Sequence, residues 1–195
     1  MTTLPQRPMA WWHLGCVSDN RRQVLIAYDN RRPKIDSTAY VQHSAQIIGD
    51  VEIGAQSSVW FNVVMRGDVH FIRIGARTNI QDNSTLHVTT GTWPTLVGDD
   101  VTVGHGVILH GCRVGNRCLV GMGAIVIDDA EIGDDCLVAA GALVTPASRI
   151  AAGHLIVGRP AKAVRPLRDD ERARLLHSAQ NYVAHAAEYR KQGIP

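Results

Sequence analysis

Three histidines, His87, His105 and His110, are the residues of this chain best suited to bind a metal ion. Three neutral histidines beside an open coordination position form the ligand set of many catalytic zinc sites. Zinc held in this way lowers the pKa of a bound water toward about 7, which makes hydroxide available at neutral pH. The histidines therefore predict a metal centre, provided that the fold brings their rings together.

A repeat of six residues predicts the fold that would position them. Hydrophobic side chains recur at every sixth position in four blocks of the sequence. They are Val41, Ile47, Ile53, Val59, Met65 and Phe71, then Ile74, Ile80 and Leu86, then Val97, Val103 and Leu109, and finally Val114, Val120, Val126, Ile132, Val138, Val144, Ile150 and Ile156. A period of six fits neither an α-helix nor a single strand, but it is typical of a parallel β-helix. We therefore predict an all-β fold, a left-handed parallel β-helix with three flat faces and about six coils of roughly 18 residues.

The repeat shifts its phase at two places, which predicts loops that leave the coils. One shift follows Arg66-Gly67-Asp68, and the other lies between Leu86 and Val97, where extra residues imply a loop around Thr89 to Pro94. Loops that leave a rigid scaffold commonly carry function.

The repeat also converts the spacing of the histidines into positions on the solenoid. His87 and His110 each follow an inward-pointing leucine, and they lie one coil apart once the loop is excised. Neighbouring strands are about 4.8 Å apart, so both rings can reach one ion at about 2.0–2.1 Å. His105 lies one face back, so we expect a neighbouring subunit to supply it. The metal centre therefore predicts a homotrimer.

The chain divides into three parts on this interpretation. Residues 1–36 form an N-terminal segment with a strand at Val24 to Tyr28, residues 37–160 form the β-helix, and residues 161–195 carry a C-terminal helix. The helix is predicted at Asp169 to Lys191, with Asp169 or Asp170 as its cap. We expect it to pack along the solenoid and to help bury the subunit contacts. Its predicted apolar face is Leu175, Leu176, Ala179, Tyr182, Val183 and Ala186.

Composition limits the classes of partner. Basic residues number 20 and acidic residues 18, so the net charge of +2 predicts no nucleic-acid partner. No apolar run approaches the roughly 20 residues that cross a bilayer, and the N-terminus lacks a signal-peptide pattern, so we expect a soluble cytoplasmic protein. Cys118 and Cys136 should stack one coil apart as free thiols. The segment at Trp11-Trp12 has no assigned role.

Several motifs together resemble the gamma-class carbonic anhydrases, and in particular their bacterial YrdA-like and PaaY-like branch. The resemblance covers nearly the whole chain after about Asp36. The motifs are Arg66-Gly67-Asp68, Gly75-Ala76-Arg77-Thr78-Asn79-Ile80-Gln81-Asp82, Leu86-His87-Val88, Val103-Gly104-His105, Leu109-His110-Gly111-Cys112 and His154-Leu155-Ile156-Val157-Gly158. The resemblance implies reversible hydration of carbon dioxide to bicarbonate on Zn2+, with Fe2+ or Co2+ as alternatives.

The resemblance also implies roles for single residues. His87 and His110 would come from one subunit and His105 from the next. Gln81 would hydrogen-bond the reactive hydroxide. Arg66 would pair with Asp82 across the subunit contact, with Asp68 and Asn79 supporting that network. Tyr182 resembles a tyrosine that reaches the active site, although an aromatic residue that packs the helix down is an equal interpretation.

One departure from the family pattern concerns proton transfer. Archetypal members carry acidic residues that export protons, whereas this chain has Val69 and His70 after its Arg-Gly-Asp motif and no acid in the Thr89 to Pro94 loop. His70 is a candidate substitute because the ordinary pKa of histidine, about 6.5, suits proton transfer. The alternative is a histidine at the rim without a role. Rapid turnover is therefore not predicted.

Two other functions fit the same scaffold, because function depends on the site and not on the fold. One is an acyl-CoA thioesterase or a hexapeptide acyltransferase, which usually needs one catalytic histidine. The other is a non-catalytic metal-binding trimer. Bound metal at a threefold contact distinguishes the first alternative from a carbonic anhydrase, and measured hydration distinguishes the second.

Overall fold

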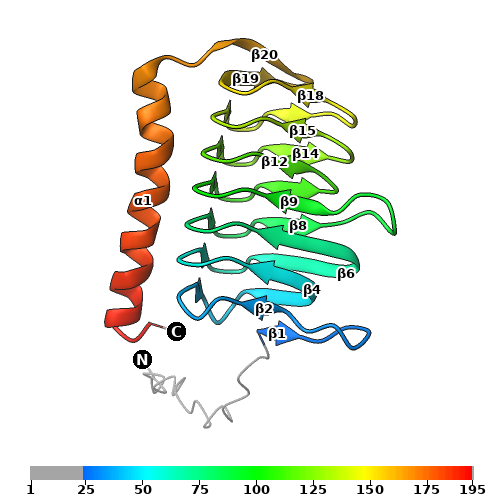
Figure 1. Ribbon diagram of the computed structural model, residues 1–195, viewed down its shortest axis with the longest axis vertical. Helices are drawn as coiled ribbons and strands as arrows, with labels where there is room; N and C mark the ends of the chain where they lie inside the picture. Colours follow the sequence, from blue (N-terminus) through cyan, green and yellow to red (C-terminus); the bar gives the residue numbers. More distant parts are fainter. Residues whose placement is uncertain (1–23, 195) are drawn as a thin grey trace, which may run out of the picture.

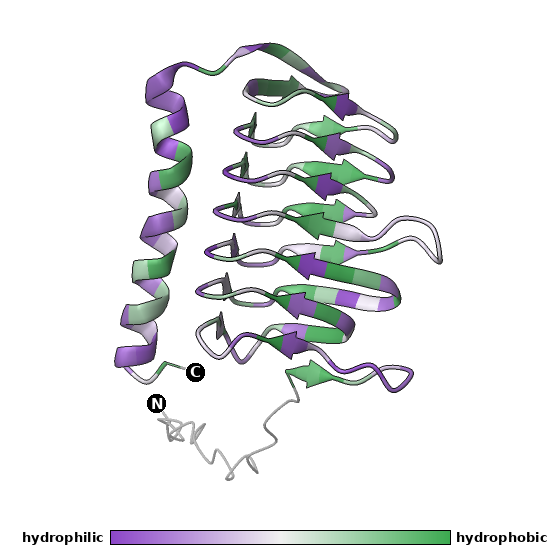
Figure 2. Ribbon diagram, viewed as in Figure 1, coloured by the Kyte–Doolittle hydropathy of each residue, from purple (hydrophilic) through white to green (hydrophobic). Residues whose placement is uncertain are grey.

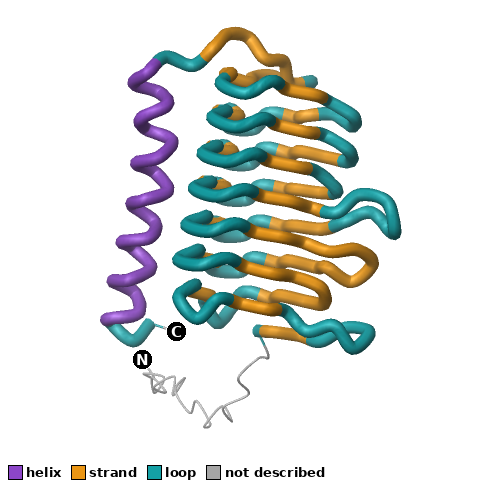
Figure 3. Tube along the Cα trace, in the orientation of Figure 1, coloured by secondary structure: helices purple, strands orange, loops and turns teal. Residues whose placement is uncertain are grey.

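The structure, a computed structural model, describes residues 24–194 and consists of a β solenoid with one helix alongside it (Figure 1). Short strands stack in parallel, and turns at the corners connect them (Figure 3). The predicted fold class is confirmed: the chain is a left-handed parallel β-helix of hexapeptide repeats with a C-terminal helix. The Trp11-Trp12 segment lies outside the described residues.

The strands form three faces, because each coil turns two sharp corners and closes on a third. The first face carries β1 (Leu25–Ile26), the first half of β4 (Gln46–Ile53), the first half of β6 (Val64–Ile74), β8 (Thr85–His87), β11 (Ile108–His110), β14 (Ile125–Ile127) and β17 (Leu143–Val144). The second face carries β2 (Lys34–Ile35), the second halves of β4 and β6, β9 (Thr95–Val97), β12 (Arg113–Val114), β15 (Glu131–Ile132) and β18 (Arg149–Ile150). The third face carries β3 (Tyr40–Val41), β5 (Ser58–Val59), β7 (Asn79–Ile80), β10 (Thr102–Val103), β13 (Leu119–Val120), β16 (Leu137–Val138) and β19 (His154–Gly158).

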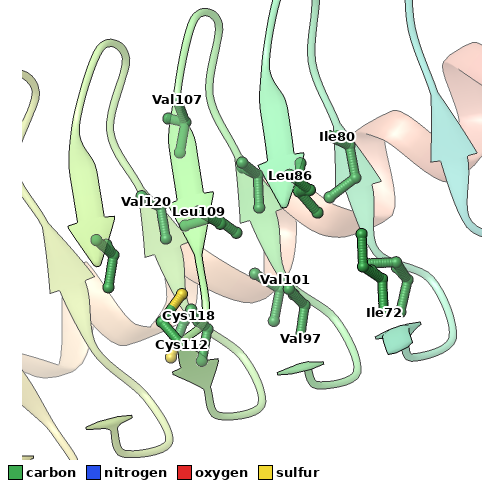
Figure 4. Packing of buried hydrophobic residues seen from close by; sticks show 14 of the residues in the cluster. Ile72, Ile80, Leu86, Val97, Val101, Val107, Leu109, Cys112, Cys118 and Val120 are labelled. Atoms are coloured by element: carbon green, nitrogen blue, oxygen red, sulfur yellow. The ribbon is translucent and has the colours of Figure 1, made fainter. Parts of the chain in front are cut away.

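The core is a column of aliphatic side chains inside the solenoid (Figure 4). Of the eight positions that continue the repeat from Val114 to Ile156, all are buried except Ile150, which is partly exposed at the last complete coil. Hydrophobic residues follow the strands through the stack, as the hydropathy colouring shows (Figure 2). Burial of this continuous column removes apolar surface from water, which is the main force that stabilises such a narrow fold.

One predicted core position, Phe71, is wrong. Ile72 is fully buried in its place, and Phe71 lies outside with the Arg73 guanidinium 4.6 Å from its ring centre. The cause is that β6 runs as one strand of 11 residues around the corner after Arg66. Gly49 of β4 pairs with Gly67 of β6, but Val51 pairs with Ile72, so β6 holds three extra residues at this corner. This odd number shifts the alternation of side chains by one residue and points Ile72 and Ile74 inward.

The solenoid has seven coils, one more than the estimate of about six. The third face holds seven parallel strands from β3 to β19, one for each coil. The spacing from Val41 to Ile156 counts only the six steps between these coils. The phase shift after Arg66-Gly67-Asp68 lies within the long strand β6, so the loop predicted there is part of a strand. The second predicted loop is present. The loop at Thr89 to Pro94 projects between β8 and β9 (Figure 1), and a bridge between Thr89 and Trp93 closes it.

The C-terminal helix, α1 (Asp169–Lys191), has the predicted bounds, but its predicted cap is wrong. Arg168 is the N-cap residue, and the Glu171 carboxylate accepts a hydrogen bond from its backbone N–H at 2.9 Å. Asp169 and Asp170 lie in the first turn, where negative charge is favourable beside the helix N-terminus.

The helix runs back along the third face and contacts β3, β5, β7 and β10 (Figure 1). Leu175, Ala179 and Ala186 are buried as predicted, whereas Leu176 is exposed because it points away from the solenoid. Before the helix, β20 (Ala161–Pro166) pairs antiparallel with β19, a strand that the period of six could not reveal.

The described cysteines are free thiols. Cys118 and Cys136 are buried one above the other, and the backbone N–H of Cys136 lies 3.4 Å from the Cys118 sulfur. This arrangement agrees with the predicted stacking. No helix within residues 24–194 is long and apolar enough to cross a bilayer.

Candidate metal centre

His87 and His110 stand side by side at the ends of β8 and β11 on the first face. They are direct partners in the strand register, as the spacing argument predicts. Their ring centres are 5.0 Å apart, and Nδ1 of His87 lies 3.1 Å from Nε2 of His110. The two histidines are 23 residues apart in the chain, which is one coil of 18 lengthened by the five-residue loop between them.

The outer nitrogen of each ring is bonded to a carboxylate. His87 Nε2 is 3.1 Å from an oxygen of Asp68, and His110 Nδ1 is 2.6 Å from an oxygen of Asp128. An ionised carboxylate only accepts hydrogen bonds, so these outer nitrogens carry the hydrogens. In neutral rings the two inner nitrogens then present lone pairs to each other. Two lone pairs at 3.1 Å repel unless a cation lies between them.

The donor set fits a divalent metal ion. Two histidine nitrogens bound to a tetrahedral ion at about 2.0–2.1 Å lie roughly 3.3 Å apart, close to the 3.1 Å observed here. Metal-bound histidines commonly donate their other N–H to a carboxylate, as both rings do here. The contacts within the protein therefore already hold these two rings in an arrangement that suits metal binding.

The environment of His87 favours its neutral form, chiefly through burial. Burial lowers the pKa of His87, and the nearby Arg66 cation lowers it further, against the opposing effect of Asp68. The pKa of Asp68 is also lowered: burial raises it, but hydrogen bonds from Arg66 and His87 outweigh that effect. In the same way, hydrogen bonds from His110 and Thr89 outweigh burial and lower the pKa of Asp128. A neutral imidazole beside ionised carboxylates is the state that binds a metal ion.

Arg66 lies next to His87 on the first face. Its guanidinium is 2.5 Å from the Asp68 carboxylate and 3.4 Å from His87 Nδ1. Within one chain, Arg66 therefore pairs with Asp68. The predicted pair with Asp82 would form between subunits and stays a prediction.

His105 lies at a different corner, in the turn after β10 where the third face meets the first. Its Nδ1 is 2.9 Å from Asp82. Within residues 24–194 of one chain, no three metal-binding side chains come close enough to share an ion. A single chain thus brings together two of the three predicted ligands.

Gln81 and Asn79 form a buried polar network on the third face. Gln81 donates to the Asn79 carbonyl oxygen at 3.0 Å, and Asn79 donates to Thr102 at 3.0 Å. Thr102 in turn donates to Ser178 on α1 at 3.0 Å. The network ties the helix to the corner that carries Asp82 and His105.

Tyr182 lies on the same side of the molecule as Asp82. Burial raises the pKa of Tyr182, and the negative charge of Asp82 raises it further. The ring also packs edge-on against Trp60 at 5.4 Å and tilts against His185 at 5.5 Å. Both interpretations of Tyr182 are compatible with this position, because it anchors the helix and stands near the corner of His105.

Asp128 is the polar neighbour of the histidines that the sequence analysis missed. It follows His110 by 18 residues, so the spacing of one coil would have identified it. The Thr89 to Pro94 loop contacts the bend of β6, since the backbone N–H of Gly91 donates to the carbonyl oxygen of Val69 at 3.3 Å. His70 lies in the same bend, where its Nδ1 accepts from the Phe71 backbone N–H at 2.9 Å.

Apolar side chains lie on the outside of the first face around the histidines, interrupted by Thr85 and Arg66. Ile108 is 40% exposed, and Met122, at the corner next to His105, is 59% exposed. Partly exposed Ile48, Val64, Ile125, Ile127 and Leu143 extend this strip along the solenoid axis. Contiguous exposed apolar surface marks sites of association.

Comparison with known proteins places the chain among hexapeptide-repeat proteins. Residues 111–146 match the bacterial transferase hexapeptide family. The chain is 51% identical to Protein YrdA of Escherichia coli strain K12, over 87% of this chain and 96% of that protein. It is 43% identical to the mitochondrial gamma carbonic anhydrase 1 of Arabidopsis thaliana, over 88% of this chain and 66% of the relative.

A solved structure has the same shape. The crystal structure of a hexapeptide transferase family protein from Anaplasma phagocytophilum is 44% identical, covers 86% of this chain and 99% of its own, and superposes with a TM-score of 0.83. The sequence identity, its coverage and the shared solenoid lead to one conclusion. The chain belongs to the gamma-class carbonic anhydrase family of hexapeptide-repeat proteins.

Proposed function

We propose that this protein catalyses the reversible hydration of carbon dioxide to bicarbonate at a divalent metal ion in a homotrimer. The observation that supports it most is the His87–His110 pair, whose facing nitrogens at 3.1 Å leave a place for a cation and whose outer nitrogens are held by carboxylates. His105 of the partner subunit completes the ligand set. Zn2+ is the proposed ion, with Fe2+ or Co2+ able to occupy the same nitrogen ligands.

The trimer is part of this proposal. His105 lies at the corner between the third and first faces, and His87 and His110 lie on the first face. The apolar strip lies on the first face as well. Packing the corner of one subunit against the first face of the next would cover Ile108 and Met122, two large exposed apolar residues of that region. The same contact would bring Asp82 toward Arg66 of the neighbouring chain.

The residues around the ion have separate tasks. A divalent ion supplies a Lewis acid that lowers the pKa of water toward about 7. Asp68 and Asp128 hold the imidazole rings. Gln81, on the corner beside His105, donates a hydrogen bond toward the reacting oxygen once the neighbouring subunit is in place. Proton export falls to His70 in the bend of β6, since that bend and the Thr89 to Pro94 loop offer no further acid beyond Asp68. We therefore expect slower hydration than an enzyme with acidic proton shuttles supports.

Metal analysis and kinetics together test the proposal. We expect about one metal ion per chain, and both His87→Ala and His105→Ala should abolish binding while the chain still folds. His154→Ala is a matched control, because His154 bonds only backbone carbonyls at the far end of the solenoid. Stopped-flow hydration should accompany the metal in the wild type and disappear in both site variants. Metal that survives the loss of His105 would show that the shared site is wrong.

A second candidate function has support from the solved structure of a hexapeptide transferase family protein with the same fold. On this alternative the chain transfers or hydrolyses an acyl group from an acyl-CoA. Turnover of acetyl-CoA by metal-free protein, without carbon dioxide hydration by the metal-loaded protein, would favour it. Bound metal without either activity would favour a non-catalytic metal-binding trimer.

A further inference from the structure

Asp128 lies in the next coil at the turn that follows β14, one residue after Ile127, the register partner of His110. Its backbone N–H donates to the His110 carbonyl oxygen at 2.8 Å, which fixes the aspartate main chain over the histidine. Its side chain then turns back to the ring, where Oδ1 accepts from His110 Nδ1 at 2.6 Å. This is the shorter of the two carboxylate contacts to the paired histidines.

The same carboxylate oxygen is held from a second side. Thr89, the first residue of the projecting loop, donates its hydroxyl hydrogen to Asp128 Oδ1 at 2.9 Å. Asp128 thus joins three segments that are distant in the chain: β11, the loop after β8, and the turn after β14. A side chain held at both its backbone and its acceptor oxygen has little freedom to rotate.

Gly111 leaves the space that this contact needs. A Cβ atom at Gly111 would lie 2.8 Å from Asp128 Oδ1 and 3.1 Å from Thr89 Oγ1, closer than such atoms normally approach. Gly111 also has a φ of +54°, a backbone conformation that favours glycine. Glycine at position 111 therefore leaves room for the Asp128 carboxylate and the Thr89 hydroxyl to meet beside the His110 ring.

We propose that Asp128 is a positioning residue of the metal centre, which holds His110 in the tautomer with hydrogen on Nδ1 and thereby aims the Nε2 lone pair at the ion. A carboxylate accepts from Nδ1–H and disfavours the tautomer that places the lone pair there. The inference rests on the proposed function only in that His110 binds the ion. Nothing in it depends on the reaction that follows.

Asp129 offers a matched control one residue further on. It also lies in the turn and also makes a short polar contact, but its carboxylate bonds Arg149 at 2.8 Å on the second face, away from the histidines. Asp128→Asn and Asp129→Asn make the same change of charge. Both asparagines keep the size of the side chain, and asparagine tolerates the turn conformation.

Two measurements test the inference on the full-length protein. Competition with a chromophoric chelator gives the affinity for Zn2+, and we expect Asp128→Asn to weaken it about 10- to 100-fold, the usual effect of losing a partner of a metal-bound histidine. Asp129→Asn should leave it unchanged. Nitrogen NMR of metal-free, 15N-histidine-labelled wild type should show His110 as the Nδ1–H tautomer, and Asp128→Asn should show a mixture.

The outcomes separate this inference from the proposed function. Zn2+ affinity in Asp128→Asn within twofold of wild type, or an Nε2–H tautomer of His110 in the wild type, overturns the positioning role. The wild-type spectrum decides even where Asp128→Asn does not fold. Weakened binding in Asp128→Asn together with absent hydration in the wild type supports the positioning role and rejects the carbonic anhydrase function. A wild type that binds no Zn2+ rejects both.

Discussion

Single nitrogen and oxygen atoms determine what the paired histidines can do. Carboxylates occupy the outer nitrogens of His87 and His110, so the inner nitrogens face each other with their lone pairs. Arg66 is the nearest cation to that pair, with its guanidinium 3.4 Å from His87 Nδ1. The Asp68 carboxylate, 2.5 Å from the Arg66 guanidinium, offsets this positive charge within the chain.

Arg66→Ala tests whether this arginine also serves the subunit contact. We expect the trimer to dissociate at higher protein concentration than the wild type, because removal of one partner from a desolvated ion pair costs about 3–5 kcal/mol. Sedimentation equilibrium measures the effect. Arg149→Ala is the control, since Arg149 is 49% exposed, as against 47% for Arg66, and also pairs with an aspartate, but on the second face. Equal trimer stability in the two variants would contradict an intersubunit Arg66–Asp82 pair.

Each strand and loop positions the site through its register. The pairing of β8 with β11 places His87 on His110, and β14 above them supports Asp128. The period of six predicts these pairings wherever the corners of a coil contain no inserted residues. It fails in β6, because three extra residues at the corner, an odd number, shift the alternation of side chains and place Ile72 in the core instead of Phe71.

Two alanine substitutions in β6 test this corrected register. Ile72→Ala should lower the free energy of unfolding by about 2–5 kcal/mol, because it leaves a cavity in a packed core. Phe71→Ala should cost less, since that ring is partly exposed and loses mainly its contact with Arg73, worth about 0.5–1 kcal/mol. Urea denaturation followed by circular dichroism compares them. A larger loss for Phe71→Ala would restore the simple period of six at this corner.

The whole solenoid presents three faces of different character. The third face is covered by α1, and the second carries alternating charges such as Lys34, Glu52 and Arg73, which pair with one another. The first face combines the histidines with an exposed apolar strip. A surface of this kind is suited to association. In the proposed trimer, one contact would both supply the third histidine and cover the strip.

Ile108→Glu tests that contact. A buried charge at the centre of the apolar strip should convert the trimer to monomers and abolish metal binding, while the fold remains, because the Ile108 side chain points outward from the coil. Light scattering after size exclusion measures the mass. Leu96→Glu is the control, an outward aliphatic at the strand register of Arg73 and Arg113 on the second face. A trimer that survives Ile108→Glu with its metal would place the subunit contact elsewhere.

The sequence by itself determined the coils, the bounds of the helix and the stacking of His87 on His110, because each depends on a local period that repeats along the chain. Only the tertiary structure decided what surrounds them: the inward turn of Ile72, the Arg168–Glu171 cap, the strand β20 and the approach of Asp128 to the His110 ring. These features depend on side-chain directions at corners and ends, where the repeat is interrupted. At these corners and ends, the contacts of a side chain depend on how segments far apart in the chain pack together, which the local repeat does not encode.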